Sequence, residues 1–155
     1  MSLDPTSRES NLRDSIIKFF VDNIYTTEGI EVSFDKGLAR PKIQGQPIEV
    51  EKWVIINFGA MEMSALSSHQ IQVFCCSRRD NEGFKLAQLR DKVMGYLTDS
   101  TQTDGFRRIN LYQSQTWTKV GGILITDIIE SQQFESEDET KYKILSCSLR
   151  WASKI

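Results

Sequence analysis

The stretch Asn81–Thr98, which reads NEGFKLAQLRDKVMGYLT, decides the fold that this sequence predicts. Its apolar residues recur at steps of three and four, and this spacing gathers them on one face of a helix. Charged and amide side chains take other positions, so the helix is expected to pack on a core through that face. Asp80 and Asn81 offer two good N-cap residues. The apolar face consists of Leu86, Leu89, Val93, Tyr96 and Leu97.

A second amphipathic helix is predicted at Asn11–Ile24, with Ser10 or Asn11 as its cap. Its length is roughly four turns at about 1.5 Å per residue, which suits a helix lying across one sheet. The apolar residues at steps of four are Leu12, Ile16, Phe20 and Ile24.

Six segments are predicted to be β-strands from their alternating or strongly apolar patterns, three before the central helix and three after it. Trp53–Gly59 is the most apolar of them and is expected at the centre of the sheet. Gly121–Gly122 is expected to break the chain just before a long strand. The predicted strands are Ile30–Phe34, Trp53–Gly59, His69–Cys76, Arg108–Gln113, Ile123–Phe134 and Lys141–Trp151.

Three connections between these strands are unusual. Lys36–Pro47 contains two prolines and two glycines, which predicts a loop or an irregular edge. Glu135–Thr140 is acidic and is expected to form a turn that its own charge keeps in water. Gly59–Ser68 is ambiguous, because it can extend the strand into a hairpin arm or form an exposed loop. In the second case the loop exposes Met61, Met63 and Leu66.

Together these elements predict an α+β fold. We expect a mainly antiparallel sheet of five to six strands with two helices on one face, in the chain order α-β-β-β-α-β-β-β. A chain of 155 residues is long enough to bury roughly 70% of its unfolded surface in one domain. We assign residues 1–10 to a disordered or expression-derived segment and residues 11–155 to a single domain.

Composition and charge narrow the class of protein. The hydrophobic share of 39% and the charged share of 26% are those of an ordinary soluble chain. The net charge of −2 argues against a protein built to hold nucleic-acid phosphates. Neither a membrane-spanning run nor a secretory signal is expected. The odd set Cys75, Cys76 and Cys147 falls in apolar strand patterns, which indicates reduced thiols and a cytoplasmic protein.

The sequence supplies no set of catalytic residues. His69 is the single histidine, and about six residues of extended chain place it roughly 20 Å from Cys75, too far for a Cys–His pair. Cys75 and Cys76 are adjacent and face opposite sides of a strand, so they cannot hold zinc together. The common phosphate, dinucleotide, protease and hydrolase motifs are missing. We therefore predict no enzyme, no cofactor and no metal site.

Two kinds of charged cluster are candidate binding sites. The acidic run can attract a cation, but it lacks the glycine and the ligand spacing of a calcium loop, so a solvated turn is favoured. It consists of Glu135, Glu137, Asp138 and Glu139. Arg78–Arg79 and Arg107–Arg108 are expected at opposite ends of the central helix, a poor basis for one phosphate track. Surface or interface arginines are the preferred interpretation.

The strands also predict a surface that needs a partner. Val54, Ile56 and Phe58 have one parity and Trp53 and Ile55 the other, so both faces of this strand are apolar. Because two helices cover only one face, we expect another element or another subunit to cover the second. The methionines of Gly59–Ser68 fit an adaptable contact surface.

The order and texture of these elements resemble the tail-terminator and tail-completion proteins of long-tailed bacteriophages and prophages. The segments that carry the resemblance read, in order, DSIIKFFVDNI, EKWVIINFG, HQIQVFCCSRRDNEG, FKLAQLRDKVMGYL, FRRINLYQ, GGILITDIIESQQF and TKYKILSCSLRW. They span about Leu12 to Trp151. The adjacent pair Cys75–Cys76 is a departure from the family's pattern.

The resemblance implies a non-enzymatic assembly factor. Such proteins form a ring, commonly hexameric, on the end of the tail tube, stop tube polymerisation and present the surface that joins the head. The implied partners are other copies of the chain, the tail tube protein and a head-completion or connector protein, with no membrane and no specific nucleic acid. The implied location is the head-proximal end of the virion tail, and the host cytoplasm during assembly. The candidate interface residues are Met61, Met63, Leu66, Arg78, Arg79, Glu135, Glu137 and Asp138.

Two further classes stay open on the sequence. One is a neighbouring role in the same particle, as a head–tail connector, neck or other minor tail protein. The other is a small-ligand-binding α+β domain or small enzyme, which requires a defined polar pocket. A nucleic-acid-binding module is disfavoured by the acidic balance.

Overall fold

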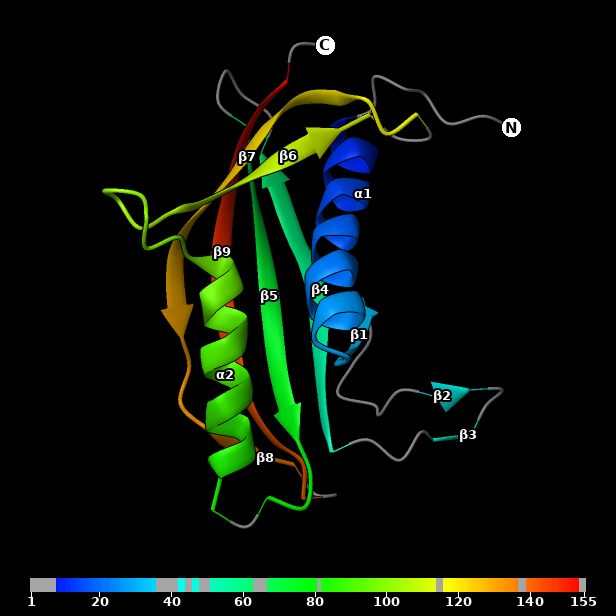
Figure 1. Ribbon diagram of the computed structural model, residues 1–155, viewed down its shortest axis with the longest axis vertical. Coiled ribbons are helices and arrows are strands. Elements are labelled where there is room, and N and C mark those ends of the chain that lie inside the picture. Colours follow the sequence, from blue (N-terminus) through cyan, green and yellow to red (C-terminus); the bar gives the residue numbers. More distant parts are fainter. Residues whose placement is uncertain are drawn as a thin grey trace.

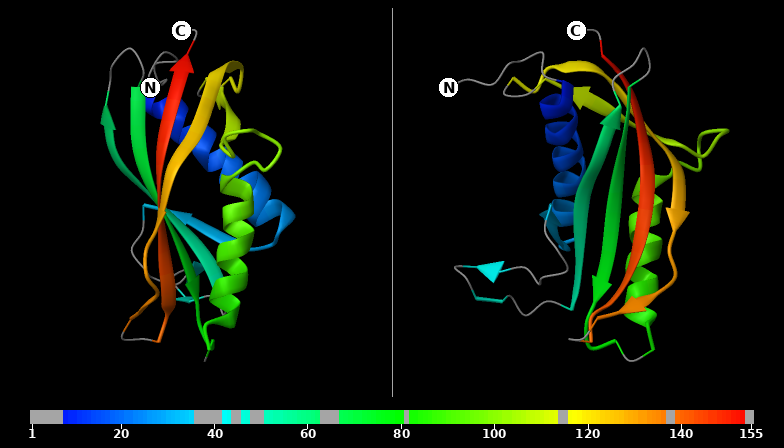
Figure 2. Two further views of the ribbon diagram at one scale, coloured as in Figure 1. Left: turned by 90° about the vertical axis from the view of Figure 1, so that its left-hand side faces the viewer. Right: turned by 180° about the vertical axis from the view of Figure 1, so that it is seen from behind.

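A curled β-sheet with two helices on one of its faces forms the body of the protein (Figures 1 and 2). The computed structural model describes residues 8–35, 42–43, 46–47, 51–62, 67–80, 82–113, 116–136 and 139–153. Within these ranges, no helix has the length and apolar character to cross a membrane. The elements are α1 (Arg8–Phe20), η1 (Val21–Thr27), β1 (Glu31–Phe34), β2 (Lys42–Ile43), β3 (Gln46–Pro47), β4 (Lys52–Glu62), β5 (Ser67–Ser77), α2 (Phe84–Leu97), β6 (Arg107–Tyr112), β7 (Lys119–Glu130), β8 (Phe134–Glu135) and β9 (Lys141–Ser153).

The first helix follows its predicted apolar stripe but not its predicted ends. It begins at Arg8, so Ser10 and Asn11 lie inside its first turns rather than at its cap, and residues 8–10 are helical. It continues as the π-helical segment η1, in which the Thr27 hydroxyl donates to the Asp22 carbonyl five residues earlier at 3.0 Å. The stripe itself is confirmed, since its four members are fully buried: Leu12, Ile16, Phe20 and Ile24.

The sheet is mixed rather than purely antiparallel, with the order β1-β4-β5-β9-β7-β6 and with β8 paired to β9. β1 runs parallel to β4, and the other pairs are antiparallel. The long connection between β1 and β4 gives the chain the length it needs to return in the same direction. The short strands β2, β3 and β8 also interrupt the predicted order, and β2 pairs with β3 in a separate hairpin.

The expectation that Trp53–Gly59 lies at the sheet centre is wrong. This segment belongs to β4, which lies next to the edge strand β1, and the middle pair is β5 and β9. Its apolar character has another cause. Val54 and Ile56 face the helices, while Trp53 and Ile55 on the opposite face are only 0% and 1% exposed. The apolar character of Trp53–Gly59 therefore indicates that both faces of the strand are buried, and it does not indicate a central position in the sheet.

The same packing revises the expected need for a second subunit. On the face away from the helices, Trp53, Ile55 and Cys76 form a small buried cluster within this chain. Phe74 and Tyr142 pack against the cluster, and their rings stack with centroids 6.1 Å apart. That part of the second face is therefore already covered.

Gly121–Gly122 does not break the chain as predicted. β7 runs through both glycines, which pair with Leu111 and Asn110 of β6. The regular pairing of β7 fails further on, where its register with β9 shifts between Thr126 and Ile129. Asp127 has a φ of +51° at this bulge. A bulge of this kind bends the strand, and pairing with β9 resumes beyond it at Ile129 and Glu130.

Asp80 fixes the start of α2 from outside the helix. The helix begins after Gly83, whose φ is +74° and which supplies no side-chain cap. The Asp80 carboxylate instead accepts hydrogen bonds from the backbone N–H groups of Leu86 at 2.9 Å and Lys85 at 3.1 Å. Burial opposes its ionisation, but these two donors and the Ser77 hydroxyl hold the pKa of Asp80 below its usual range. Of the two predicted caps, Asp80 serves the helix and Asn81 lies outside the described residues.

An ion cluster ties α2 to the sheet. Arg90 donates to both carboxylate oxygens of Glu130 in β7, at 3.1 and 2.9 Å, and Lys143 of β9 donates to the same group at 2.9 Å. The hydrogen bonds from Arg90 and Lys143 lower the pKa of Glu130 to about 2. Four members of the predicted apolar face of α2 are buried: Leu86, Leu89, Val93 and Leu97. The fifth, Tyr96, is half-buried, and its hydroxyl donates to Glu28 at 2.7 Å.

We predict that Glu130→Gln destabilises the protein in a pH-dependent way. Because the carboxylate has a lowered pKa in the folded state, its contribution is complete above 4.5, its ordinary pKa, and is lost as the pH falls towards 2. The cluster is partly open to water, so we expect a loss of about 1–2 kcal/mol at neutral pH. Urea unfolding of both proteins between pH 2 and pH 7 measures the difference. Glu82→Gln, an exposed change beside the same helix, is the control, and an equal effect of the two variants would contradict the prediction.

Candidate interaction surfaces

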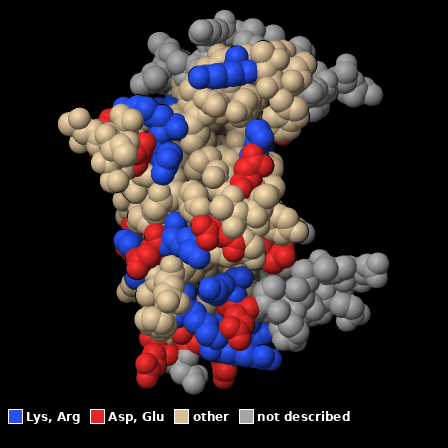
Figure 3. All heavy atoms as spheres, in the orientation of Figure 1, with Lys and Arg blue, Asp and Glu red and all other residues tan. Residues whose placement is uncertain are grey.

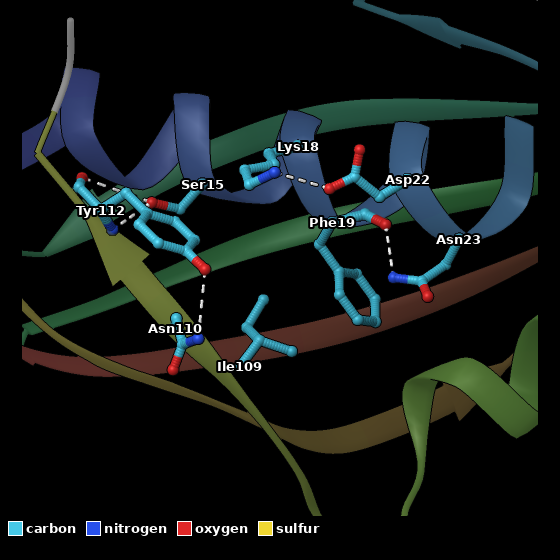
Figure 4. Close-up of a pocket in the computed structure, with 8 residues that line it drawn as sticks. All are labelled: Ser15, Lys18, Phe19, Asp22, Asn23, Ile109, Asn110 and Tyr112. Carbon is cyan, nitrogen blue, oxygen red and sulfur yellow. Dashed lines mark hydrogen bonds and ion pairs between the residues drawn. The ribbon is translucent and has the colours of Figure 1, made fainter. Parts of the chain in front are cut away.

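A pocket of about 220 Å³ lies between the first helical region and strand β6 (Figure 4). The residues on its helical side are spaced three and four apart, beside the buried stripe of α1, so they face the strand that crosses the helix. Asn110 donates to the Tyr112 hydroxyl at 3.1 Å on the strand side. The lining residues are Ser15, Lys18, Phe19, Asp22, Asn23, Ile109, Asn110 and Tyr112.

Ser15 connects α1 to the end of β6. Its hydroxyl donates to the Asn11 carbonyl at 2.7 Å and accepts the backbone N–H of Tyr112 at 2.8 Å. Ser15 is buried. β6 is an edge strand among the described elements, so its outer side has no neighbouring strand, and the Ser15 hydroxyl provides an acceptor for the Tyr112 N–H there. The curl of β6 towards α1 is visible in Figure 1.

Beside this pocket, Trp117 presents an aromatic ring to solvent. It lies between β6 and β7, is 48% exposed and has a φ of +57°. A bulky side chain rarely adopts this conformation, which costs of order 1–3 kcal/mol. The ring contacts Tyr112 edge-on with centroids 6.2 Å apart, and the Lys18 ammonium lies 6.0 Å from the Trp117 ring centroid. The Lys18 ammonium donates a hydrogen bond to the Asp22 carboxylate, which raises the pKa of Lys18.

A second pocket, of about 370 Å³, lies at the opposite end of β6. It is bounded by the C-terminal end of α2, the residues that lead into β6, and the bulge of β7. Its walls carry apolar side chains, and Asp127 stands at its rim in the left-handed conformation of the bulge. The lining residues are Leu97, Thr98, Ser100, Asp104, Gly105, Phe106, Ile125, Asp127 and Ile128.

The nucleophile and metal candidates do not form a reactive site in the described part of the chain. Burial raises the pKa of the Cys75 and Cys147 thiols to about 12, so both are neutral. His69 is buried, with its ring centroid 5.9 Å from that of Phe58. No group of three His, Cys, Asp or Glu side chains suited to a metal ion occurs among the described residues.

The arginine pairs have mostly structural roles. Arg107 donates to the carbonyl oxygens of Tyr96 at 3.1 Å and Gly95 at 3.0 Å, which satisfies the C-terminal end of α2. Arg108 pairs with Asp104 at 2.8 Å. Acidic and basic side chains are interspersed over the face shown in Figure 3, so this face carries no continuous basic tract.

The predicted interface residues are not gathered at one place among the described residues. Arg78 is half-buried after β5, Arg79 is exposed with a φ of +53°, and Glu135 is exposed in β8. Met61 lies in β4, which extends into the hairpin arm considered above, but its side chain lies outside the described part of the structure. The remaining four residues also lie outside it: Met63, Leu66, Glu137 and Asp138.

Trp117 is not among the interface residues predicted from the sequence. It lies between the predicted strands Arg108–Gln113 and Ile123–Phe134. A usable signal was present, because Trp117 is an aromatic residue in the otherwise polar run QSQTWTK, where no alternating strand pattern explains it. Isolated exposed aromatics of this kind are typical of contact surfaces.

Comparisons with known proteins show the fold and not a family. The sequence matches no protein-family model and no curated protein. A solved protein whose name states no function has a TM-score of 0.58 at 9% identity, over 94% of this chain and 96% of that chain. A chain of the virion of a native gene transfer agent (GTA) particle has a TM-score of 0.53 at 13% identity, over 94% of this chain and 98% of that chain. The same fold, over nearly its whole length, therefore occurs in a virion.

We predict that Ser15→Ala loosens the end of β6. The change leaves the partly buried N–H of Tyr112 without its acceptor, which costs about 1 kcal/mol. Hydrogen exchange at Tyr112 should accelerate more than exchange in the central strands β5 and β9. Ser100→Ala, a change of the same kind at an exposed position, serves as the control. Unchanged protection of Tyr112 would show that Ser15 does not hold this strand.

Proposed function

We propose that this protein is a structural subunit of a phage-like particle that assembles as a ring on the end of the tail tube. In this role it stops tube polymerisation and presents the surface that joins the head. The observation that carries the proposal is the fold similarity to a chain of the GTA virion, which covers 94% of this chain and 98% of that chain. The similarity supports a virion role; the position at the tail end rests on the order of the elements in the sequence.

The shape of the subunit suits such a role. A closed ring is built from head-to-tail contacts, which require two different surfaces on opposite sides of each subunit. The two pockets described above lie at opposite ends of β6 and offer such surfaces. The β4–β5 hairpin provides a further element, built from two strands of 11 residues each, that can reach a tube or a neighbour.

A tube-growth experiment tests the function. A candidate tail tube protein from the same genome is polymerised with increasing amounts of the purified protein, and tube lengths are measured by electron microscopy. We expect mean tube length to fall with the amount added and label to appear at one end of each tube. A head–tail connector or neck protein would bind finished ends or head complexes and leave tube length unchanged. Indifference to every tail component would overturn the proposal.

We also predict that the tip of the β4–β5 hairpin contributes to assembly. The double variant Met63→Asp, Leu66→Asp replaces apolar contact surface with charge and should impair ring formation, as seen by light scattering. The variant Gln70→Asp, Gln72→Asp adds the same charge at exposed positions of β5 and is the control. Assembly that is unchanged in the Met63 and Leu66 variant would exclude this tip from the contact.

A further inference from the structure

Two surface features at opposite ends of β6 complement each other. The first is the Trp117 knob, which we define as Trp117 with Tyr112 and Lys18 beside it. The second is the α2–β7 pocket, defined as the 370 Å³ cavity that includes Phe106, Ile125 and Ile128. The six residues of β6 separate them by roughly 20 Å. In Figure 1 the loop before β6 and the connection after it lie on opposite sides of the subunit, so a chain cannot fill its own pocket.

The knob has the properties of an interface anchor. Trp117 is 48% exposed, whereas the other two tryptophans, Trp53 and Trp151, are 0% and 3% exposed. Its backbone is held in the left-handed region, with its N–H donating to the Gln113 carbonyl at 2.9 Å. Exposed, oriented tryptophans dominate binding energy where they occur at protein interfaces. Strained backbone of this kind persists where a function requires it.

The pocket has the size and the lining for an indole. Its volume falls in the range of roughly 300–1,000 Å³ that is typical of small-molecule sites, and its walls include Leu97, Phe106, Ile125 and Ile128. A tryptophan side chain can bury about 150–250 Å² of surface in such a site. The apolar walls would exclude water from the inserted ring.

Charge at the two features is also complementary. Lys119 follows the knob, is exposed and makes no ion pair within the described residues. Asp127 at the pocket rim is exposed, and within the described part of the chain its carboxylate accepts a hydrogen bond from the Thr126 hydroxyl at 3.3 Å. Opposite charges at the rim fix the register of a contact more than they strengthen it.

We propose that Trp117 of one subunit inserts into the α2–β7 pocket of a second copy of this chain, with Lys119 of the first beside Asp127 of the second. The contact joins different surfaces on the two copies, so each subunit offers one knob and one pocket. Repetition of such a contact closes a ring where its rotation permits. The inference deepens the proposed function, because it assigns the contact between neighbouring subunits of the assembly.

Two variants that each disable one half of the contact test this assignment. Trp117→Ala removes the knob and Ile128→Asp places a charge in the pocket. Truncation of an interface anchor weakens association by about 30-fold or more, so each variant alone should be monomeric by light scattering at concentrations where the wild type assembles. Mixed in equal amounts, the two variants should form a one-to-one dimer and nothing larger. The intact knob of the Ile128→Asp variant fills the intact pocket of the Trp117→Ala variant, and the mutated knob and the mutated pocket cannot bind a further copy.

Controls separate a lost contact from a lost fold. Tyr25→Ala removes another aromatic of matched exposure, 49%, and should assemble like the wild type. Trp117→Gly relieves the positive φ, so it should keep or raise the unfolding temperature while it abolishes assembly. Because the other two tryptophans are already buried, a blue shift of fluorescence on assembly reports burial of Trp117.

Several results would overturn the inference. These are assembly of Trp117→Ala equal to that of the wild type, a mixture that stays monomeric, or a wild type that is monomeric up to millimolar concentration. The outcome is independent of the tube-growth experiment. If the protein shortens tubes but fails the mixing test, the proposed function stands and the proposed contact is wrong. If it passes the mixing test but does not shorten tubes, the contact stands and the proposed function is wrong.

Discussion

The packing of β6 against α1 is the constraint on which the rest of the surface depends. The sheet must curl for β6 to reach the helix, and the contact is secured by the apolar residues of both elements and by the hydrogen bond from the Tyr112 N–H to Ser15. This contact between β6 and α1 creates the pocket between the two elements. It also sets the directions in which the two ends of β6 point, because the strand lies across the subunit (Figure 2). Without the curl, neither the Trp117 region nor the pocket at the end of α2 would have its present place.

The helices hold the sheet in this shape from one side. Their buried stripes form one core with the inward residues of the strands, and Arg90 links α2 to β7 and β9 through Glu130. Asp80 supplies the first turn of α2 with acceptors that the helix lacks on its own. The candidate surfaces are therefore at element ends and connections, supported by the packed interior, where binding residues are commonly found in proteins.

Much of this fold could be predicted from the sequence because its signals are periodic. The apolar stripes of both helices and the shared face of Leu145, Cys147 and Leu149 follow directly from the steps of four and of two. The position of β4 beside the edge could not be predicted, since apolarity measures burial and not neighbours. The parallel pairing of β1 depends on a long connection whose path no local pattern specifies.

The candidate site was less predictable for a related reason. Trp117 and Asp127 are each placed by a single backbone conformation with positive φ, and neither belongs to a repeated pattern. The pocket at the end of α2 combines residues from three separate segments, which only the tertiary structure brings together. The interface residues chosen from the sequence were selected for exposure and flexibility, and such criteria do not indicate which of them will be neighbours.

The edges of the sheet have a consequence for how these subunits can associate. β1 offers four residues at one edge, and at the other edge the Tyr112 amide of β6 is already bonded to a side chain of the same subunit. Both edge strands are short, and one end of β6 is already bonded within the subunit, which makes continuous growth by strand addition less favourable. In the proposed assembly, copies of this protein associate instead through side-chain contacts, which saturate once each partner is bound. A component that ends the growth of a filament needs this property, because it must not become a template for a filament of its own.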